Sequence, residues 1–293
     1  MPMRLVVAAL LPLVLLAGCG DDTVSASELT ADPAGTPYAG PMGVLPDHSD
    51  LAVALAASGS AGLAAECAGE PRRGGGGDYA DGGLESVQET PQKALDNWID
   101  EESAPVPRDG YRIERVDGDR VLLSYDVDRL TKVAVIVRDG ITDFNDDTGW
   151  GVESWSSCDP AELGVDVAED LGFQIWTDRD GRPVPTTDVT SSTGAAHCDW
   201  QDLTWLSVGQ TNDVDRDVDQ YLSGDDDGQL ADFLSTAADD SATLPDDAAD
   251  TRWRRDGREL WIGEDPAAAY LVSLDDPTDV QLWPAVTEPI GCA

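Results

Sequence analysis

The fold is decided by a stretch at residues 111–138, which reads YRIERVDGDRVLLSYDVDRLTKVAVIVR. Asp117-Gly118 separates two runs of alternating and β-branched residues, and this is the strongest local signal of a β-hairpin. A third run, Lys132–Arg138, follows closely, and a fourth lies at Gly151–Ser156. Together the four runs predict an antiparallel meander.

A second meander is predicted in the last part of the chain. Thr251–Arg255 leads through Asp256-Gly257 to Glu259–Ile262, after which Ala268–Ser273 and Val280–Trp283 follow. The two halves of the sequence therefore carry similar patterns. Coincidence between two common α+β patterns is the alternative explanation.

A short amphipathic helix is expected before each meander. In the first helix Thr90 is a candidate N-cap, Pro91 takes the first helical position, and four apolar residues line one face: Ala94, Leu95, Trp98 and Ile99. The second helix is expected over residues 228–234, with Asp227 as its candidate cap. An extra hairpin, Phe173–Trp176 with Pro183–Val189, is expected at the start of the second half, before Cys198.

The cysteines favour two disulfides outside the cytoplasm. Cys19 belongs to an export motif described below, which leaves an even number: Cys67, Cys158, Cys198 and Cys292. Four cysteines allow three connectivities. Because each half contains a helix and a meander between two cysteines, we expect Cys67–Cys158 and Cys198–Cys292.

These features predict an α+β fold of two tandem domains, each a helix plus an antiparallel β-meander closed by one disulfide. The expected order is a signal peptide (residues 1–18), a flexible tether (19–46), a first domain (47–159) and a second domain (160–293). The tether range is rich in Asp, Ala, Gly, Pro and Thr, a composition that is typical of linkers.

The N-terminus resembles the signal of bacterial lipoproteins. Arg4 precedes a twelve-residue apolar stretch, Leu5–Leu16, which is too short to span a bilayer as a helix. The sequence Leu16-Ala17-Gly18-Cys19 matches the lipobox. This resemblance implies cleavage before Cys19 and lipid attachment to its sulfur, so we expect a protein anchored to the outer face of the cell membrane. An ordinary secretory signal is the alternative.

The charge of the chain limits its partners. Its 293 residues carry 58 acidic and 18 basic side chains, a formal net charge of −40. Such an excess repels phosphate backbones, and we therefore expect no binding to nucleic acid. The densest stretch, residues 213–250, contains 13 Asp and one Arg. An acidic stretch of this kind is typical of a hydrated surface.

Calcium is the one cofactor that the acidic residues suggest, because it binds several oxygen ligands at alternating positions. Asp143, Asn145 and Asp147 begin like a calcium loop, but the glycine comes one position late and Ser154 stands where the twelfth residue, Glu, belongs. A second alternating series, Asp213–Asp219, lacks the glycine. We expect no cofactor, with weak calcium binding as the alternative.

No catalytic residues are predicted. His197 and Asp199 flank Cys198 and resemble a base with its orienting partner, but a disulfide-bonded Cys198 supplies no thiolate. His48 is expected to be a solvated loop residue. The nine tryptophans are expected mainly in the core, with a carbohydrate-stacking platform as the alternative.

Several stretches resemble a family of uncharacterised secreted or lipid-anchored actinobacterial proteins. They include Val121–Asp126, Trp150–Leu163, His197–Asp202, Asp256–Trp261 and Gly291–Ala293. The resemblance implies a cell-envelope location and no particular activity. We expect a non-enzymatic envelope lipoprotein with a binding or interaction role, whose envelope protein or polymer partner and oligomeric state are unknown. The alternatives are a carboxylate-dependent hydrolase of an envelope polymer and a structural or calcium-binding surface protein.

Overall fold

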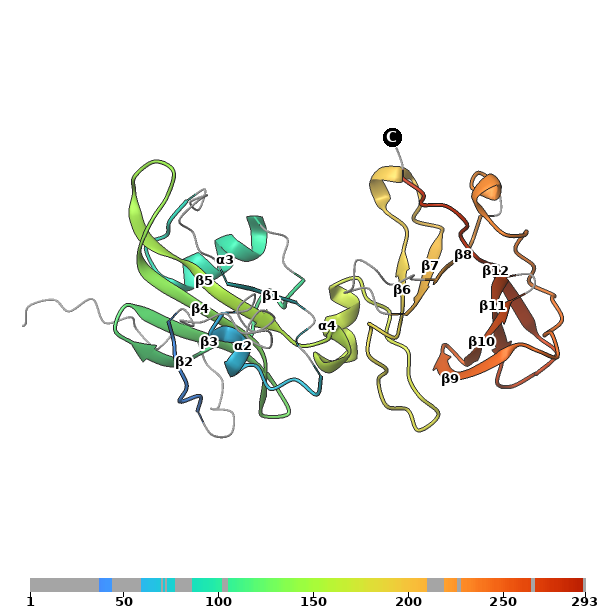
Figure 1. The fold of residues 1–293 in the computed structure, drawn as a ribbon, viewed down its shortest axis with the longest axis horizontal. Helices are drawn as coiled ribbons and strands as arrows, with labels where there is room; N and C mark the ends of the chain where they lie inside the picture. Colours follow the sequence, from blue (N-terminus) through green and yellow to red (C-terminus); the bar gives the residue numbers. More distant parts are fainter. Residues whose placement is uncertain are drawn as a thin grey trace, which may run out of the picture.

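The computed structural model describes residues 37–43, 59–69, 71, 73–76, 86–101, 105–209, 219–225, 228–264 and 267–291. Antiparallel β-sheets dominate this part of the chain. We call residues 37–171 the N-terminal half and residues 172–291 the C-terminal half. Figure 1 shows the two halves side by side, with the short helix α4 between them.

The N-terminal half is built on one five-stranded antiparallel sheet. Its strands, in spatial order, are β1 (Arg73–Gly76), β5 (Thr148–Ser157), β4 (Leu130–Thr142), β3 (Arg120–Val127) and β2 (Arg112–Asp117). The predicted meander is confirmed as β2 to β5, and β1 adds a strand beside β5. Asp128 and Arg129, both with positive φ, form the tight turn between β3 and β4.

Both faces of this sheet are covered. Helix α3 (Pro91–Glu101) packs its apolar side, including Leu95 and Trp98, on one face. Helix α2 (Ala61–Ala64) lies on the other face. As a result, all five residues of Val133–Val137 are 0 % exposed. The predicted N-cap is confirmed, because the Thr90 hydroxyl accepts the backbone N–H of Lys93 at 3.2 Å.

Residues 37–43 run over the α2 side of the sheet. The Tyr38 N–H donates to Glu114 Oε1 at 2.6 Å, and Arg115 Nη1 donates to the Gly40 carbonyl at 2.8 Å. Met42 is buried against Leu122 and its neighbours. We call residues 37–43 the strap. The strap lies within the range that the sequence assigns to a tether.

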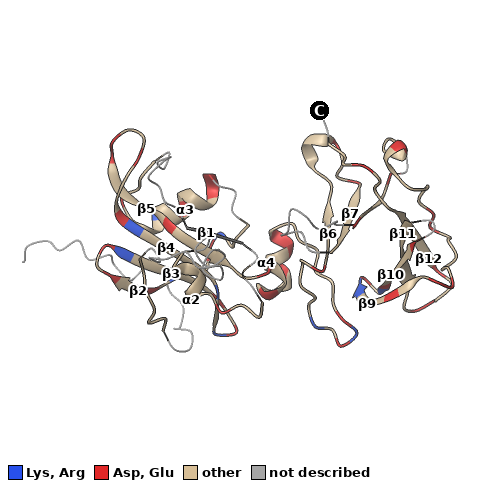
Figure 2. Ribbon diagram, in the orientation of Figure 1, with Lys and Arg blue, Asp and Glu red and all other residues tan. Residues whose placement is uncertain are grey.

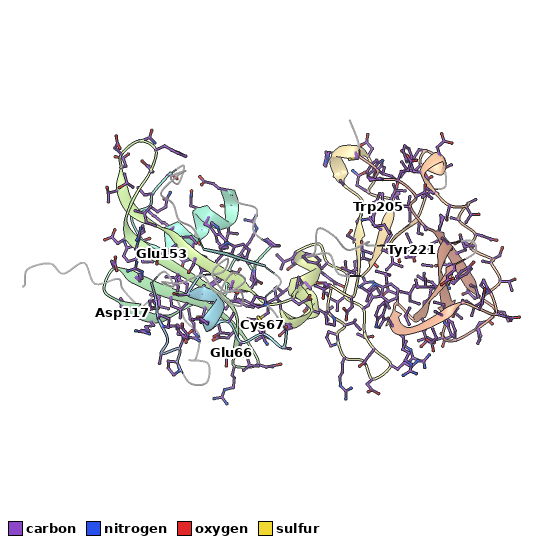
Figure 3. All side chains as sticks on the ribbon, in the orientation of Figure 1. Glu66, Cys67, Asp117, Glu153, Trp205 and Tyr221 are labelled. Carbon is purple, nitrogen blue, oxygen red and sulfur yellow. A yellow bond between two sulfur atoms is a disulfide. The ribbon has the colours of Figure 1, made fainter. Side chains whose placement is uncertain are left out.

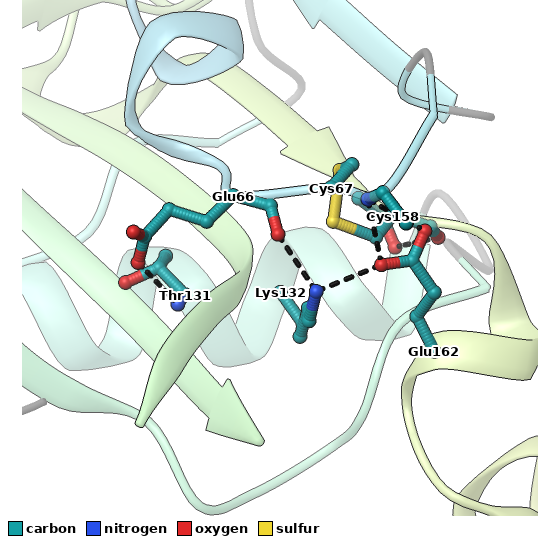
Figure 4. The surroundings of a disulfide bond; sticks show 8 residues. Glu66, Cys67, Thr131, Lys132, Cys158 and Glu162 are labelled. Carbon is teal, nitrogen blue, oxygen red and sulfur yellow. Dashed lines mark hydrogen bonds and ion pairs between the residues drawn. A yellow bond between two sulfur atoms is a disulfide. The ribbon is translucent and has the colours of Figure 1, made fainter. Parts of the chain in front are cut away.

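A disulfide joins the end of α2's segment to the end of β5. The Cys67 and Cys158 sulfurs are 2.00 Å apart, which confirms this predicted pair. Beside it, Lys132 Nζ donates to the Glu66 carbonyl and to Glu162 Oε2, both at 2.7 Å (Figure 4). The cross-link and the buried lysine together fix the segment before Cys67 against β4 and β5.

The C-terminal half contains two smaller antiparallel sheets. The first consists of β6 (Val189–Thr193), β7 (Thr204–Val208) and β8 (Asp219–Ser223). The second consists of β9 (Ala249–Arg255), β10 (Arg258–Glu264), β11 (Ala267–Ser273) and β12 (Val280–Pro284), and it confirms the second predicted meander. The two-residue turn Asp256-Gly257, with φ of +49° and +73°, joins β9 to β10 as expected.

The two small sheets share a core. Leu206 and Tyr221 from the three-stranded sheet pack with Leu260 and Leu271 from the four-stranded sheet. Trp205, which precedes Leu206 on β7 and is labelled in Figure 3, packs in a different cluster. That cluster contains Trp200 and residues near the C-terminus. Each face of the three-stranded sheet therefore contacts its own hydrophobic cluster.

Two expectations for the C-terminal half need correction. The predicted helix over 228–234 is wrong, since this segment forms only the 3₁₀ turn η4 (Ala231–Phe233). Asp225 lies two residues before the predicted cap Asp227. Its carboxylate accepts the backbone N–H groups of Gln229 and Leu230, which holds this segment in a turn. The C-terminal half is thus mostly β-structure rather than α+β.

In place of the predicted hairpin before Cys198, the structure has only isolated β-bridges. Thr177 makes a bridge with Pro183 and another with Arg254, and Gln174 bridges Ser191. Trp176 is buried, and its indole N–H donates to Ser191 Oγ at 2.8 Å. Residues 173–184 therefore form a loop that packs on the C-terminal core without continuous strands.

Helix α4 (Val165–Asp170) and the turn η2 (Pro160–Glu162) connect the halves. Val167 and Leu171 pack on the N-terminal core, while Glu169 lies 3.8 Å from Arg255 of the C-terminal half. Near the same junction the buried Asp159 carboxylate accepts both the N–H and the hydroxyl of Thr186 at 2.9 Å. Another turn, η3 (Ala196–Cys198), precedes β7.

Within the described ranges, no helix is both long and apolar enough to cross a membrane.

Candidate functional site

A cavity lies inside the N-terminal half, where α4 packs near β3 and the loop before β2. Its volume is ≈ 270 Å³, and it is lined by the loop before β2, by β3 and by α4 with its C-cap: Pro107, Arg108, Asp109, Tyr125, Val167, Asp170 and Leu171. The three segments are distant in sequence and meet because β3 and α4 contribute to the same core. Concave sites of this kind between packed units are common positions for small ligands.

The aromatic wall of the cavity is supported from behind. Tyr125 packs against the buried ring of Tyr111, with ring centroids 5.9 Å apart. Gly110 has a φ of +84°, and a Cβ at this position would lie 3.0 Å from the Tyr125 ring. Glycine therefore allows the loop to follow a left-handed path close to the ring. The cavity wall is fixed by this packing.

The charged side chains that line the cavity differ in whether they have a partner in the described chain. Arg108 Nη1 donates to Asp100 Oδ1 at 2.5 Å, so its charge is already paired. Asp109 and Asp170 are exposed, and neither side chain makes a hydrogen bond or ion pair with the described part of the chain. Figure 2 shows that α4 is strongly acidic. The cavity therefore offers two carboxylates whose oxygens are available to a ligand.

Tyr125 contributes a neutral phenol to this site. Burial raises its pKa above the ordinary value, and the nearby Asp109 carboxylate raises the pKa further. Burial likewise raises the pKa of Tyr111. Both phenols keep their protons at neutral pH. Tyr125 is therefore an aromatic wall with a hydroxyl group, and it adds no negative charge.

The buried carboxylates of the N-terminal half have partners of their own. Arg112 lies 2.5 Å from Asp126 and 3.4 Å from Glu114, so one guanidinium serves both carboxylates. Arg120 and Arg138 lie 2.7 Å and 3.2 Å from the buried Glu153 (Figure 3). A buried charge is tolerated when it is paired in this way.

These pairs give a glycosidase mechanism no specific support. Such a mechanism needs two carboxylates flanking the bond that breaks, one of them with a proton to donate. Glu114 and Asp126 instead face a shared guanidinium, and the strap N–H of Tyr38 binds Glu114 directly. Their arrangement holds the strap on the sheet.

The predicted calcium residues lie at the tip of the β4–β5 hairpin. The Asp143 carboxylate accepts the backbone N–H groups of Asn145 and Asp147 at 2.8 and 3.0 Å. This is a local turn that the side chain stabilises. Among the described residues, no group of three or more His, Cys, Asp and Glu side chains is arranged to hold a metal. Calcium binding stays a prediction.

The His197 cluster is on the surface. His197 and Asp199 are both exposed, Asp199 has a φ of +57°, and within the described chain no hydrogen bond joins their side chains. Cys198 between them is disulfide-bonded. The described residues assemble no nucleophile or oriented base at this turn.

Several predicted sites fall outside the described residues. They are the lipidation residue Cys19, His48, Cys292 and the acidic residues 213–218. Cys198–Cys292 therefore stays a prediction for the second disulfide.

All nine tryptophans take part in hydrophobic packing. Trp98 and Trp176 are buried, and the other seven are half-buried members of the hydrophobic clusters: Trp150, Trp155, Trp200, Trp205, Trp253, Trp261 and Trp283. Trp98 and Trp155 pack with ring centroids 5.1 Å apart. This packing supports the core interpretation of these residues, and a partly exposed stacking platform stays the alternative.

No sequence motif marks the residues that line the cavity. Asp109, Tyr125 and Asp170 stand in three separate segments and share no motif. Only Gly110 gave a local signal, since glycine before a strand indicates a special backbone conformation. The site depends on tertiary packing, which residue spacing does not report.

Comparisons with protein families, with curated proteins and with solved structures give no match for this chain.

Proposed function

We propose that this protein is a lipid-anchored, non-enzymatic binding protein of the cell envelope, and that the cavity beside α4 is its ligand site. The observation that carries the binding role is this cavity, which has a fixed aromatic wall and two carboxylates that no described residue pairs with. The envelope location rests on the apolar stretch Leu5–Leu16 and on the lipobox that ends at Cys19.

We also propose a domain arrangement and a pairing of the cysteines. The chain is taken as two tandem units, closed by Cys67–Cys158 and by a second bond between Cys198 and Cys292. Two facts support this scheme: Cys67 and Cys158 are joined, and Cys198 is disulfide-bonded. Mass spectrometry of non-reduced peptides would find Cys198 linked to Cys292, whereas a link to any other cysteine would contradict the scheme.

The anchor places the ligand site near the membrane. Seventeen residues, 20–36, lie between Cys19 and Pro37 at the start of the strap. A flexible chain of that length has a root-mean-square span of about 20–25 Å. The body would stand clear of the head groups, as its acidic surface favours.

The location is tested by following the processing of the precursor. Globomycin, which blocks the lipoprotein signal peptidase, should produce a heavier form that retains residues 1–18. Cys19→Ala should abolish incorporation of an alkyne-labelled fatty acid, while Cys292→Ala should leave that labelling intact. An unlabelled wild-type protein would refute the anchor.

The binding role is tested separately on the soluble chain from residue 20. Nuclear magnetic resonance titration with a mixture of small amines, acids and alcohols should shift signals of residues 107–109 and 167–171. Leu171→Trp, which fills the cavity, should abolish those shifts. Leu274→Trp changes an exposed leucine elsewhere and should leave them unchanged.

Thermal melting verifies that Leu171→Trp is folded, and Val167→Phe replaces it if it is not. If no compound shifts the cavity signals of the wild-type protein, the proposed ligand site is wrong. If shifts persist in the folded Leu171→Trp variant, the compounds bind elsewhere and the cavity is not the site.

A further inference from the structure

We infer that the cavity beside α4 selects a small organic cation, specifically a primary ammonium group carried on a short aliphatic chain. The inference rests on the proposed function, because it names the ligand class of the same site. It follows from the charges, the walls and the size of the cavity.

The charges around the cavity favour a cation. Three ionisable side chains of Asp and Arg line it, and Arg108 is already paired with Asp100 at 2.5 Å. Asp109 and Asp170 have no such partner in the described chain. Because the Arg108–Asp100 pair is exposed, it is a weak obstacle to an anionic ligand, but such a ligand would also face two carboxylates, whereas an ammonium group has two acceptors available.

The walls match the rest of such a ligand. Val167 from α4, Leu171 at its C-cap and Pro107 supply apolar surface for an aliphatic chain. An aromatic ring attracts a cation at its face, and the Tyr125 ring lines the cavity with Tyr111 packed against it. An ammonium group with hydrogen-bonding N–H is favoured because carboxylate oxygens accept those hydrogens directly.

The size of the cavity limits the ligand. A volume of ≈ 270 Å³ lies below the usual range for drug-sized ligands, which is roughly 300–1,000 Å³. A single short chain with one charged end suits this space, and a sugar polymer does not. Because the carboxylates are exposed, we expect weak binding that depends strongly on salt.

The test compares three probes of equal length but different charge: pentylammonium, pentanoate and 1-pentanol. Each is titrated into the soluble chain at pH 7 while the signals of residues 107–109 and 167–171 are followed. Pentylammonium should saturate these signals, and pentanoate should leave them unchanged. Pentanol should bind at least about tenfold more weakly than pentylammonium, because it lacks the charge-assisted bonds.

Two charge-matched variants separate the cavity from general attraction to the acidic surface. Asp109→Asn with Asp170→Asn should weaken pentylammonium binding about tenfold. Asp240→Asn with Asp246→Asn removes the same charge at exposed positions away from the cavity and should leave the affinity unchanged. An equal loss in both double variants would overturn the inference, since the amine would then bind as a diffuse counter-ion.

The outcomes also separate this inference from the proposed function. If pentanoate or pentanol shifts the cavity signals as strongly as pentylammonium, the cation selectivity is wrong, but a ligand site beside α4 stands. If none of the three probes shifts those signals while another compound of the mixture does, the ligand class is again wrong. If no compound of any class binds there, both proposals fail.

Discussion

Strand β4 of the first meander and strand β10 of the second differ in how fully they are covered. In β4 of the N-terminal half, every residue of Val133–Val137 is fully buried, because α3 covers one face and α2 with the strap covers the other. In β10 of the C-terminal half, Leu260 is fully buried but its neighbours Trp261 and Ile262 are half-buried. Both are interior strands, but β4 has a run of five fully buried residues that β10 lacks; β11, beside β10, has a buried run of its own at Ala268–Leu271.

This difference shows how the two halves are stabilised. The N-terminal half depends on segments brought from far along the chain, namely the strap, α2 and a disulfide that closes a 91-residue loop. The C-terminal half depends on two small sheets packed on each other, on ion pairs such as Arg179–Glu259 and on the disulfide at Cys198. We therefore expect the stability of the two halves to change by different amounts when a disulfide, a core side chain, the paired Glu259 carboxylate or the buried Tyr221 phenol is removed.

The largest effect is expected from removal of the disulfide. Cys67→Ala with Cys158→Ala should lower the free energy of unfolding by about 4–5 kcal/mol, because a loop of this length then gains entropy in the unfolded chain. Hydrogen exchange followed by mass spectrometry should show the loss of protection in β2–β5. Equal loss of protection in β9–β12 would contradict the idea that the halves are stabilised separately.

A smaller effect is expected from single core substitutions, and it should reveal the difference in coverage. Leu122→Ala and Leu123→Ala face opposite sides of β3, and each should cost about 2–5 kcal/mol. In β10 Leu260→Ala should cost as much, but Ile262→Ala should cost less. Urea unfolding measures all four, with the exposed Val116→Ala as a control. Leu260 and Ile262 lie on the same face of β10, so similar costs for the two variants would contradict the weaker burial of Ile262.

Loss of the Glu259 charge on β10 should have a moderate, pH-dependent effect on the free energy of unfolding. Arg179 lies 2.6 Å from Glu259 and lowers the pKa of that carboxyl, with Arg254 adding to the effect. A depressed pKa contributes stability above about pH 4.3, the ordinary value for Glu, and this stability disappears as the pH falls through the folded-state pKa.

Glu259→Gln should therefore lower the free energy of unfolding by about 1–2 kcal/mol at pH 7 and by less at pH 3. Urea titrations at both pH values measure the difference. Glu264→Gln, at the exposed end of the same strand, is the matched control and should have no effect. A cost for Glu259→Gln that is unchanged at pH 3 would show that the ion pair is not its source.

The smallest effect at neutral pH is expected from Tyr221→Phe. Burial raises the pKa of Tyr221 to about 12, and the Asp219 carboxylate adds to this shift. An elevated pKa gives stability that is complete below about pH 10, the ordinary value for Tyr, and is lost as the pH rises toward 12. Tyr221→Phe should unfold at a higher pH than the wild type in a circular dichroism titration. Identical alkaline midpoints would contradict this role.

The meanders could be predicted because their signals are local. Asp256-Gly257 specifies a tight turn with positive φ at both residues, and the flanking runs specify strands. The turn at Asp128-Arg129 has the same geometry without glycine, so composition alone gave no signal that β4 begins at Leu130. The helix α3 was recognised from its Thr90 cap, the Pro91 start and its apolar face.

The segments that depend on tertiary contacts could not be predicted. Residues 228–234 have helical spacing, but seven residues form no stable helix alone. The Asp225 carboxylate and the cluster around Trp200 hold them as a turn instead. The cavity was missed for a related reason, because Tyr125 and Asp170 come together only when α4 packs on the core.

The position of the Cys67–Cys158 bond has a mechanical consequence. A pulling force on the N-terminal end of the chain could peel away the strap and α2, but at Cys67 the tension would pass through the sulfur bridge to Cys158. Strands β1 to β5 all lie inside the loop that the bridge closes, so the load would bypass them and continue toward α4. The main sheet would be shielded from tension along the chain, and the junction between the halves would carry it.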